Sequence, residues 1–349
     1  MKKSTLFTIG FLLALSIAAA PKSRFTAERT VVDGVPVVRL TDPARGMEVS
    51  ILPPMGNMGC EFKVHEKNLL FFPDVKLTEF QQKPMQTGIP FMAPWANRLD
   101  DTGFWANGRK YNFDLTLGNV RRDNNGLPIH GLMTGLSVWE VTRVGADRGS
   151  AFVTSSFDFW KYPDLVAQWP FAHKYEMTYR LKDGSLEVST VVYNMSTEAM
   201  PLAIGFHPYY RIPDVPRDQW LLHMPARAAV VADGRRLPTG ELKPVDLPNP
   251  LPLKDRTLDD GFTDLERDAK GMALFSIESG KRRIELLFGP KFPVAVVWEP
   301  AKTEFVCVEP MTGVTNAINL YNAGRYSGLQ VVPAGGRWAE SFWIRPVGF

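Results

Sequence analysis

The sequence is poor in cysteine, in histidine and in net charge. Its 349 residues include 2 Cys and 5 His, and 40 Lys and Arg nearly balance 37 Asp and Glu. So few cysteines exclude a disulfide scaffold and a cysteine-rich zinc module. A formal net charge of +3 gives no electrostatic basis for nucleic-acid binding. The charged fraction of 22% and the 22 Phe, 9 Trp and 9 Tyr exclude a disordered chain.

The motifs of several enzyme classes are also missing. Gaps between the five histidines, His65, His130, His173, His207 and His223, are too long for the short spacings of many zinc sites. The sequence has no G-x-S-x-G nucleophile elbow, no phosphate-binding glycine loop and no dinucleotide-binding fingerprint. What remains is chemistry that needs only acids, bases and hydrogen bonds, so we expect no metal and no cofactor.

Residues 1–20 are predicted to be a signal peptide. Lys2 and Lys3 precede an apolar run over 6–20 that ends in three alanines. The run is short for a membrane span, which needs about 20 residues, and no later stretch is long and apolar enough. We therefore expect an exported protein, periplasmic or secreted, without a membrane attachment after cleavage. Residues 21–349 are expected to form a single domain.

The two cysteines, Cys60 and Cys307, could pair in an oxidising compartment. They lie far apart in the sequence, which does not show whether their side chains meet. Two separate buried thiols are the favoured interpretation.

Alternation of apolar and polar residues with a period of two is the dominant pattern and predicts strands. The clearest case is a hairpin over 175–192 that turns at Asp183-Gly184, where Gly and Asp accept positive φ angles. The 28 prolines and the lack of a long helical stripe leave room for few helices. We therefore predict an all-β fold, an antiparallel sandwich or barrel. Other strand pairs are predicted over 30–40 with Pro36 in the turn, 138–157, 274–288, 294–308 and 329–344, and the proline-rich stretch 237–253 is predicted to be a long loop.

Polar residues gather in four segments that are rich in Pro, Gly and aromatic residues. Because Pro and Gly interrupt strands, these polar residues are expected at strand ends or in loops, where a rigid sheet can present them. Each candidate residue also has an ordinary structural explanation when it is considered alone. The segments are Gly88–Arg98, Asn124–Gly131, Gly205–Tyr210 and Phe305–Gly313, the last followed by Asn316 and Asn319.

Together, these segments resemble the aldose 1-epimerase (galactose mutarotase) family, in the same order and from about Val31 to the C-terminus. The family's Gly after His-Gly is Leu132 here, and Tyr210 stands where Phe is usual, but neither change removes a functional group. The motifs that carry the resemblance are Asn97-Arg98, His130-Gly131, His207-Pro208-Tyr209, an Asp loop over Leu258–Phe262 and Glu309-Pro310.

The resemblance implies a large antiparallel β-sandwich, the galactose mutarotase-like supersandwich, with few short helices. It also implies an isomerase that interconverts the α and β anomers of a free aldohexose by acid–base ring opening. Glu309 would be the general base and His207 the general acid. The implied sugar-binding residues are Asn97, Arg98, His130 and Asp259, with Asp260 as the competitor of Asp259.

Three alternatives stay open. A non-catalytic carbohydrate-binding sandwich would use the same cleft without a reaction. A sugar-phosphate epimerase would need additional cations, and Arg121 and Arg122 are candidates. A polysaccharide-processing enzyme on a related fold would need an open groove. Trp95 and Trp169 could stack on a sugar ring, although core packing is the favoured role for both.

Overall fold

The computed structural model describes residues 25–135 and 139–349. The predicted signal peptide lies outside the described residues, and so does Val138, the first residue of one predicted strand.

The largest sheet has nine strands in the order β19-β16-β21-β22-β26-β12-β11-β10-β9. Its β11–β12 hairpin is the one predicted from the alternating sequence, and it turns at Asp183 and Gly184, which both have positive φ. Alternate residues of both strands are buried, as the period of two requires. The strands are β9 (Glu140–Ala146), β10 (Ser150–Asp158), β11 (His173–Lys182), β12 (Ser185–Asn194), β16 (Leu221–His223), β19 (Leu251–Pro252), β21 (Ala273–Ser279), β22 (Arg282–Phe288) and β26 (Arg337–Val347).

A five-stranded antiparallel sheet in the order β1-β2-β3-β4-β5 forms the N-terminal part of the described chain. The predicted β1–β2 hairpin is present, but Pro36 lies within β2, opposite Val31, and not in the turn. The turn consists of Asp33 and Gly34, whose positive φ angles suit a two-residue connection. The strands are β1 (Thr26–Val32), β2 (Val35–Asp42), β3 (Met47–Leu52), β4 (Met58–Val64) and β5 (Lys67–Asn68).

An eight-stranded sheet follows the order β18-β17-β20-β23-β24-β14-β6, with β15 also paired to β24. Two predictions are wrong here. The stretch predicted as a long loop contains β18 and, in the nine-stranded sheet, β19. The expected Asp loop is part of strand β20, paired with β23. The strands are β6 (Phe91–Met92), β14 (Gly205–Phe206), β15 (Tyr209–Tyr210), β17 (Ala226–Ala232), β18 (Pro238–Pro244), β20 (Leu258–Leu265), β23 (Val294–Glu299) and β24 (Val306–Met311).

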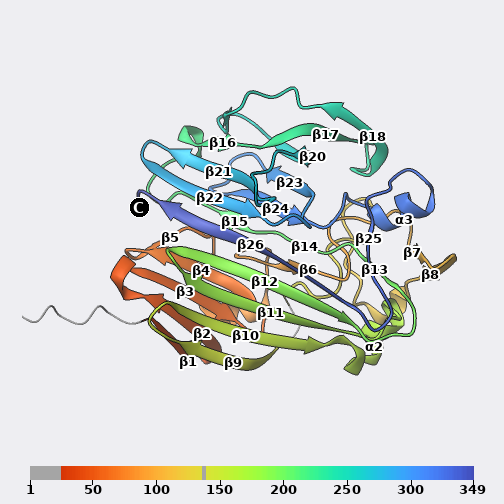
Figure 1. Cartoon of the computed structure of the whole chain (residues 1–349), viewed down its shortest axis with the longest axis horizontal. Helices are drawn as coiled ribbons and strands as arrows, with labels where there is room; N and C mark the ends of the chain where they lie inside the picture. The colour runs from red at the N-terminus through yellow and green to blue at the C-terminus, as the bar shows by residue number, and fades with distance from the viewer. Residues whose placement is uncertain (1–24, 136–138) are drawn as a thin grey trace, which may run out of the picture.

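The three sheets pack around one large apolar core. The five-stranded sheet contacts β9, β10 and β11 through β1 and β2, and Figure 1 shows these red and green strands side by side. The eight-stranded sheet contacts the nine-stranded sheet elsewhere, because the ring centroids of Phe206 in β14 and Phe342 in β26 lie 4.9 Å apart. Apolar side chains of all three sheets belong to the same buried cluster. The predicted all-β antiparallel sandwich is therefore confirmed.

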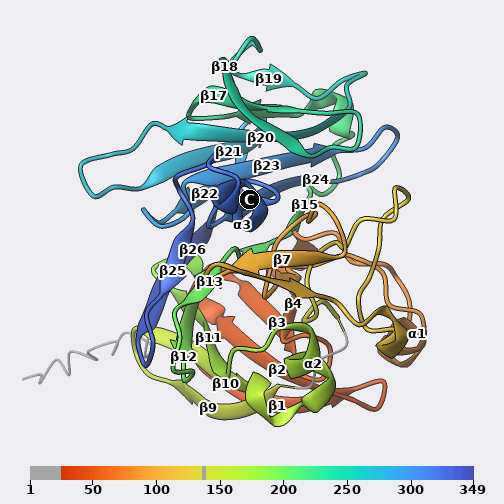
Figure 2. The ribbon, with the colours of Figure 1, turned by 90° about the vertical axis from the view of Figure 1, so that its right-hand side faces the viewer.

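The helices in the described residues are short and lie outside the sheets. Helix α3 contacts strand β7, and both lie on the side that faces the viewer in Figure 2. None of these helices has the length and apolar character that a membrane crossing requires. The remaining elements are α1 (Leu77–Gln82), α2 (Pro163–Gln168), α3 (Ala317–Asn322), the 3-10 helices η1 (Pro43–Arg45), η2 (Leu115–Leu117), η3 (Phe159–Lys161) and η4 (Arg217–Gln219), and the strand pairs β7 (Gly103–Ala106) with β8 (Arg109–Asn112) and β13 (Met200–Leu202) with β25 (Gln330–Val332).

Two open questions from the sequence are answered by the core. Cys60 in β4 and Cys307 in β24 are both buried and free, so they are separate thiols. Trp95 and Trp169 are fully buried, and the Trp95 ring stacks on Phe113 at 4.9 Å. These two tryptophans are therefore core residues with no face open to a sugar.

Candidate functional site

The four polar segments meet through backbone hydrogen bonds, although up to about two hundred residues separate them. The Gly88–Arg98 segment pairs with the His130 segment, because the His130 amide donates to the Asn97 carbonyl at 2.9 Å. It also pairs with the third segment, because the His207 amide donates to the Pro90 carbonyl at 3.0 Å. Gly205 in turn pairs with Met311 of the fourth segment. Backbone pairing thus assembles the site from loops and from the short strands β6, β14 and β24.

The loop at His130 depends on a glycine. A Cβ on Gly131 would lie 2.1 Å from the carbonyl oxygen of Ala93, so a side chain at this position would force the two segments apart. The residue before it, His130, has φ of +63°, and Asn97 has φ of +56°. Left-handed backbone is uncommon for non-glycine residues and is found at binding sites whose surroundings hold it in place.

Strand register brings three more side chains to one face of the eight-stranded sheet. Asp259 of β20 lies opposite Trp298 of β23, and Glu309 of β24 lies opposite Val296 of β23. Because side chains alternate between the two faces, Asp259, Trp298 and Glu309 share one face. Asp260 occupies the alternate position and belongs to the opposite face, so the sheet presents Asp259 rather than its neighbour.

His207 and Glu309 form a direct contact. The His207 Nε2 atom lies 3.2 Å from Glu309 Oε1, and the two side chains are 6% and 1% exposed. Glu309 Oε2 and His207 Nδ1 are buried without a hydrogen-bond partner within the described residues. An unpaired buried polar atom costs free energy, and a bound ligand can relieve that cost. The pair is thus buried but still able to make further hydrogen bonds.

Burial shifts the pKa values of both members of this pair. Loss of hydration raises the pKa of Glu309, the negative charge of Asp259 raises it further, and Arg98 acts in the opposite direction. Burial lowers the pKa of His207 to about 3, and the positive charge of Arg121 adds to this effect. Both directions favour the neutral forms of the two side chains.

Arg98 lies between two carboxylates. Its Nε donates to Asp123 at 2.8 Å, and its Nη2 lies 3.5 Å from Asp259. Its Nη1 also donates to the side-chain oxygen of Asn97 at 3.1 Å. Partial burial favours the neutral acid at Asp123, but the bonds from Arg98 and from two backbone amides lower its pKa. The guanidinium is therefore held in one orientation, which suits directed donation to sugar oxygens.

His130 completes the cluster. Its ring centroid lies 5.3 Å from that of His207, and its Nδ1 lies 2.5 Å from the side-chain nitrogen of Gln86. Burial lowers its pKa well below the ordinary value, with further contributions from His207, Arg121 and Arg98. With Gln86 donating to Nδ1, the neutral imidazole carries its proton on Nε2 and can donate it to a ligand.

These side chains line one cavity of about 490 Å³. It is here called the reaction cavity. All six residues implied by the resemblance line this cavity: Asn97, Arg98, His130, His207, Asp259 and Glu309.

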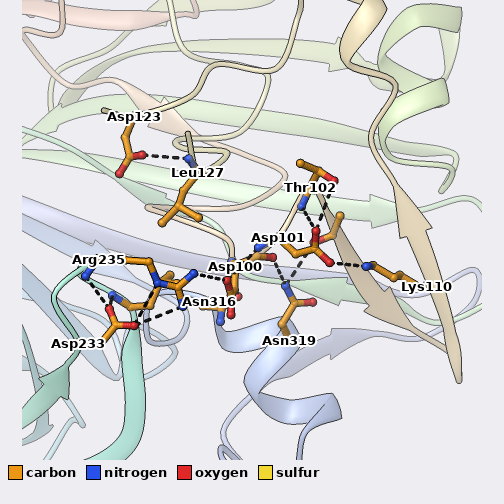
Figure 3. Close-up of polar contacts among 12 residues, drawn as sticks. Asp100, Asp101, Thr102, Lys110, Asp123, Leu127, Asp233, Arg235, Asn316 and Asn319 are labelled. Carbon is orange, nitrogen blue, oxygen red and sulfur yellow. Dashed lines mark hydrogen bonds and ion pairs between the residues drawn. The ribbon is translucent and has the colours of Figure 1, made fainter. Parts of the chain in front are cut away.

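A set of hydrogen bonds around residues 100–103 holds the segment that carries Arg98. Figure 3 shows Asn316, Asn319 and Arg235 gathered around Asp100. The Asn316 side chain accepts from the Asp100 amide at 3.0 Å, and the Asn319 side chain donates to the Asp100 carbonyl at 3.0 Å. Arg235 contacts the Asp100 carboxylate at 3.1 Å. The polar residues singled out after Glu309 thus support the loop and do not line the cavity.

Several lining residues were not predicted from the sequence. Asp123 directly precedes the Asn124–Gly131 segment, and its role as the partner of Arg98 depends on the folded loop. Trp298 lies in an ordinary alternating strand, and only the register against β20 places it beside Asp259. Gln86 lies in a stretch without any motif. No group of three His, Cys, Asp or Glu in residues 25–135 and 139–349 is arranged to hold a metal ion.

Comparison with known proteins supports the resemblance noted in the sequence. The family model for aldose 1-epimerase matches residues 36–345. The chain belongs to the aldose 1-epimerase family. Its structure is similar to that of a galactose mutarotase-like protein from Clostridium acetobutylicum, with a TM-score of 0.83 and 23% identity over 93% of this chain and 99% of that one.

Other relatives are more distant. Galactose 1-epimerase from Lactobacillus acidophilus matches with a TM-score of 0.71 and 14% identity over 92% of this chain and 97% of the other. The uncharacterised protein YihR of Escherichia coli is 24% identical over 151 residues, which are 42% of this chain and 44% of that protein. The match thus spans less than half of this curated relative. At these identities the structural similarity establishes the fold, and the reaction and its residues are argued below from the site.

Proposed function

We propose that the protein is an aldose 1-epimerase that interconverts the α and β anomers of a free aldohexose. The observation that carries this proposal is the contact between His207 and Glu309 at 3.2 Å, on the wall of a cavity that Arg98, His130 and Asp259 also line. Family membership supports the class of reaction.

The reaction requires one proton acceptor and one proton donor side by side. The C1 hydroxyl loses a proton while the ring oxygen O5 gains one, and the C1–O5 bond opens to an aldehyde. Rotation about C1–C2 and ring closure then give the other anomer. Because O1 and O5 are both bonded to C1, the groups that serve them must be neighbours, as His207 and Glu309 are.

We assign Glu309 as the base at the C1 hydroxyl and His207 as the acid at O5. The base must be ionised and the acid protonated, whereas burial favours both neutral forms, so we infer that a proton moves from Glu309 to His207 across their contact before the base acts. Arg98 favours this transfer because its charge stabilises ionised Glu309. Ring closure reverses the roles and restores the proton, so no other reactant is consumed. Each positioned acid or base contributes roughly 10²–10⁴-fold.

Polarimetry on freshly dissolved α-galactose and α-glucose tests the proposal. The wild-type protein is expected to accelerate the approach to the anomeric equilibrium, and His207→Asn is expected to slow it by at least about 100-fold. The matched control is His223→Asn, which changes a half-exposed histidine of β16 outside the cavity. Calorimetric sugar binding without acceleration by the wild-type protein would favour a non-catalytic carbohydrate-binding module.

One observation favours a second candidate, an epimerase for aldoses that carry an anionic group such as a phosphate. Arg121 and Arg122 line the reaction cavity, and neither has an acidic partner within the described residues. Arginine is well suited to phosphate because its donors form a fork. Comparing kcat/KM for glucose 6-phosphate and glucose in the wild type and in Arg122→Gln distinguishes the two substrates. An advantage for the phosphate that disappears in the variant would support this candidate.

We also propose that the protein acts after export. The apolar segment over 6–20 behind Lys2 and Lys3 supports this location. Sugar phosphates are mainly cytoplasmic, so export agrees better with a free sugar. Detection of the tagged chain, shortened at its N-terminus, in the exported fraction would test this.

A further inference from the structure

Arg236 lines the reaction cavity and has no part in the proposed reaction. It lies in the tip of the β17–β18 hairpin, residues 233–237, and Gly234 of the same tip also lines the cavity. The β17–β18 pairing shifts register between Val230 and Ala232, just before the tip. A bulge of this kind bends its strand and re-aims the residues that follow. The hairpin therefore carries a bend between its paired strands and the cavity wall.

The strand that carries Asp259 is paired on one side at this position. Its partner in β23 is Trp298, whereas the pairing of β20 with β17 ends at Phe262 and does not extend to Asp259. Arg236 occupies the open side. Its Nη1 donates to the Asp259 carbonyl at 3.3 Å, and its Nε lies 3.9 Å from Asp259 Oδ2. One arginine thus contacts both the backbone and the carboxylate of Asp259.

Two guanidinium groups approach the same oxygen of this carboxylate. Arg98 Nη2 lies 3.5 Å from Asp259 Oδ2, and Arg236 approaches it from the hairpin tip. The carboxylate itself accepts no hydrogen bond within the part of the chain that the structure describes. Opposite charges at these distances attract the carboxylate without occupying its lone pairs. Asp259 is therefore held in place and still able to accept hydrogen bonds from a ligand.

The hairpin tip fixes the direction of Arg236. The residue has φ of +66°, which is uncommon for a residue other than glycine. The Asp233 side chain accepts the Arg235 amide at 2.8 Å and so stabilises the turn. Figure 3 shows Arg235 reaching Asp100, which its Nη1 contacts at 3.1 Å. The tip is therefore tied to the segment that carries Arg98 as well as to strand β20.

We propose that Arg236 is a positioning residue that holds the Asp259 carboxylate where it accepts a hydrogen bond from a sugar hydroxyl. This inference rests on the proposed function, in which Asp259 binds the sugar. The Arg236 side chain is 50% exposed, and solvent screens its contacts, so they contribute little to the stability of the fold. Loss of Arg236 should therefore weaken sugar binding and leave folding intact.

Initial rates measured by polarimetry over a range of α-glucose concentrations test the proposal with Arg236→Gly. Glycine adopts a positive φ without strain, so this variant removes the side chain alone. We expect KM to rise roughly fivefold and kcat to stay within about twofold, because binding is weakened and the reaction is not. The matched control is Lys302→Gly, which changes an exposed basic residue with φ of +59° in the β23–β24 turn and should leave both constants unchanged.

The combined variant Arg236→Gly/Asp259→Asn shows whether Arg236 acts through Asp259. Its KM should stay within about twofold of that of Asp259→Asn alone, because the carboxylate that Arg236 positions is already lost. The proposal is overturned if the two effects on KM multiply or if Arg236→Gly keeps the wild-type KM. It is also overturned if Arg236→Gly lowers kcat at an unchanged KM, as a loss of folded protein would.

Failure of the proposed function has a different signature. A wild-type protein that binds glucose without accelerating anomer interconversion would refute the proposed function. Calorimetric Kd values for the same variants would then test Arg236, with Kd expected to follow the pattern given for KM. A wild-type protein that neither accelerates the interconversion nor binds glucose would refute both.

Discussion

The described part of the chain contains two His–Glu pairs, one in each of the two larger sheets, and the pairs differ in burial and in surroundings. His207 and Glu309 meet at 3.2 Å in the eight-stranded sheet, and His223 and Glu278 meet at 2.9 Å in the nine-stranded sheet. The side chains of His207 and Glu309 are 6% and 1% exposed, whereas those of His223 and Glu278 are 37% and 28% exposed. A histidine and a glutamate within hydrogen-bond distance of each other therefore do not by themselves form a functional site.

What distinguishes the buried pair is its surroundings. Water screens the exposed pair, so its contribution to stability is small, about 0–1 kcal/mol. The buried pair has shifted pKa values and unpaired polar atoms, and it faces a cavity that Arg98 also lines. Perturbed protonation next to a cavity is characteristic of functional sites. The predictions below use the exposed pair as the internal control wherever the comparison allows.

The largest expected effect is the loss of activity in Glu309→Gln. The amide cannot accept a proton from the C1 hydroxyl, so the rate of anomer interconversion is expected to fall by at least about 100-fold. Glu278→Gln makes the same chemical change in the exposed pair and is expected to leave the rate unchanged. Polarimetry on both variants checks this, and equal rates in the two would remove Glu309 from its role.

The next effect concerns the orientation of the cation in the cavity. Arg98→Lys keeps the charge but loses the fork that contacts Asp123, Asp259 and Asn97. We expect kcat/KM to fall by roughly tenfold or more, since a lysine ammonium is held by fewer hydrogen bonds. As a control, Arg227→Lys changes an exposed arginine of β17 and is expected to have no effect. Wild-type kinetics in Arg98→Lys would show that charge alone is sufficient.

The third prediction concerns stability and pH. Burial raises the pKa of Glu309 in the folded protein above its unfolded value, so the folded state binds the proton more tightly. This contribution is complete below the unfolded pKa of about 4.5 and is lost as the pH rises through the folded value. The free energy of unfolding of Glu309→Gln, relative to wild type, should therefore increase between pH 5 and pH 8.

Urea unfolding at both pH values measures this difference. Glu278→Gln, whose side chain is in contact with water, should show a change of less than about 0.5 kcal/mol over the same range. A flat difference for Glu309→Gln would mean that its carboxylate is not stabilised in the neutral form by burial.

The smallest expected effect concerns the support of the Arg98 loop. Asn319→Ala removes three hydrogen bonds: the two that the side chain donates to the carbonyls of Asp100 and Gly103, and the one that it accepts from the Trp105 amide. We expect a loss of about 1–2 kcal/mol in the free energy of unfolding, because buried carbonyls lose their partner, and a decrease of a few-fold in kcat/KM. Tyr321→Ala, an exposed residue of the same helix α3, serves as control. An unchanged kcat/KM in Asn319→Ala would separate the loop from the activity.

The two larger sheets also differ in how far the sequence predicts them. The β11–β12 hairpin is local: its alternation and its Asp183-Gly184 turn are visible in one stretch of chain, and the structure has the hairpin with that turn. In the eight-stranded sheet, β6, β14 and β15 are two residues long and pair with distant strands. No period can be read from two residues, so the sequence does not predict these strands.

The same reason explains which site residues were predicted. His207, Arg98 and Glu309 lie in motifs that a resemblance can match residue by residue. Trp298 lies in a strand with ordinary alternation, and its position at the cavity follows from the register between β20 and β23. The prediction that Leu258–Phe262 is a loop is wrong because its charged residues suggested solvent, whereas the strand pairs fully with β23.

The most direct test of the central claim, that His207 and Glu309 act as one unit on the sugar, is a double-variant cycle. The rate of anomer interconversion is measured by polarimetry for wild type, Glu309→Gln, His207→Asn and the combined variant. If the pair shares one proton, either change alone disables it, and the combined variant should lose no more activity than the more damaged single variant. Losses that multiply in the combined variant, or a single variant that retains the wild-type rate, would contradict the claim.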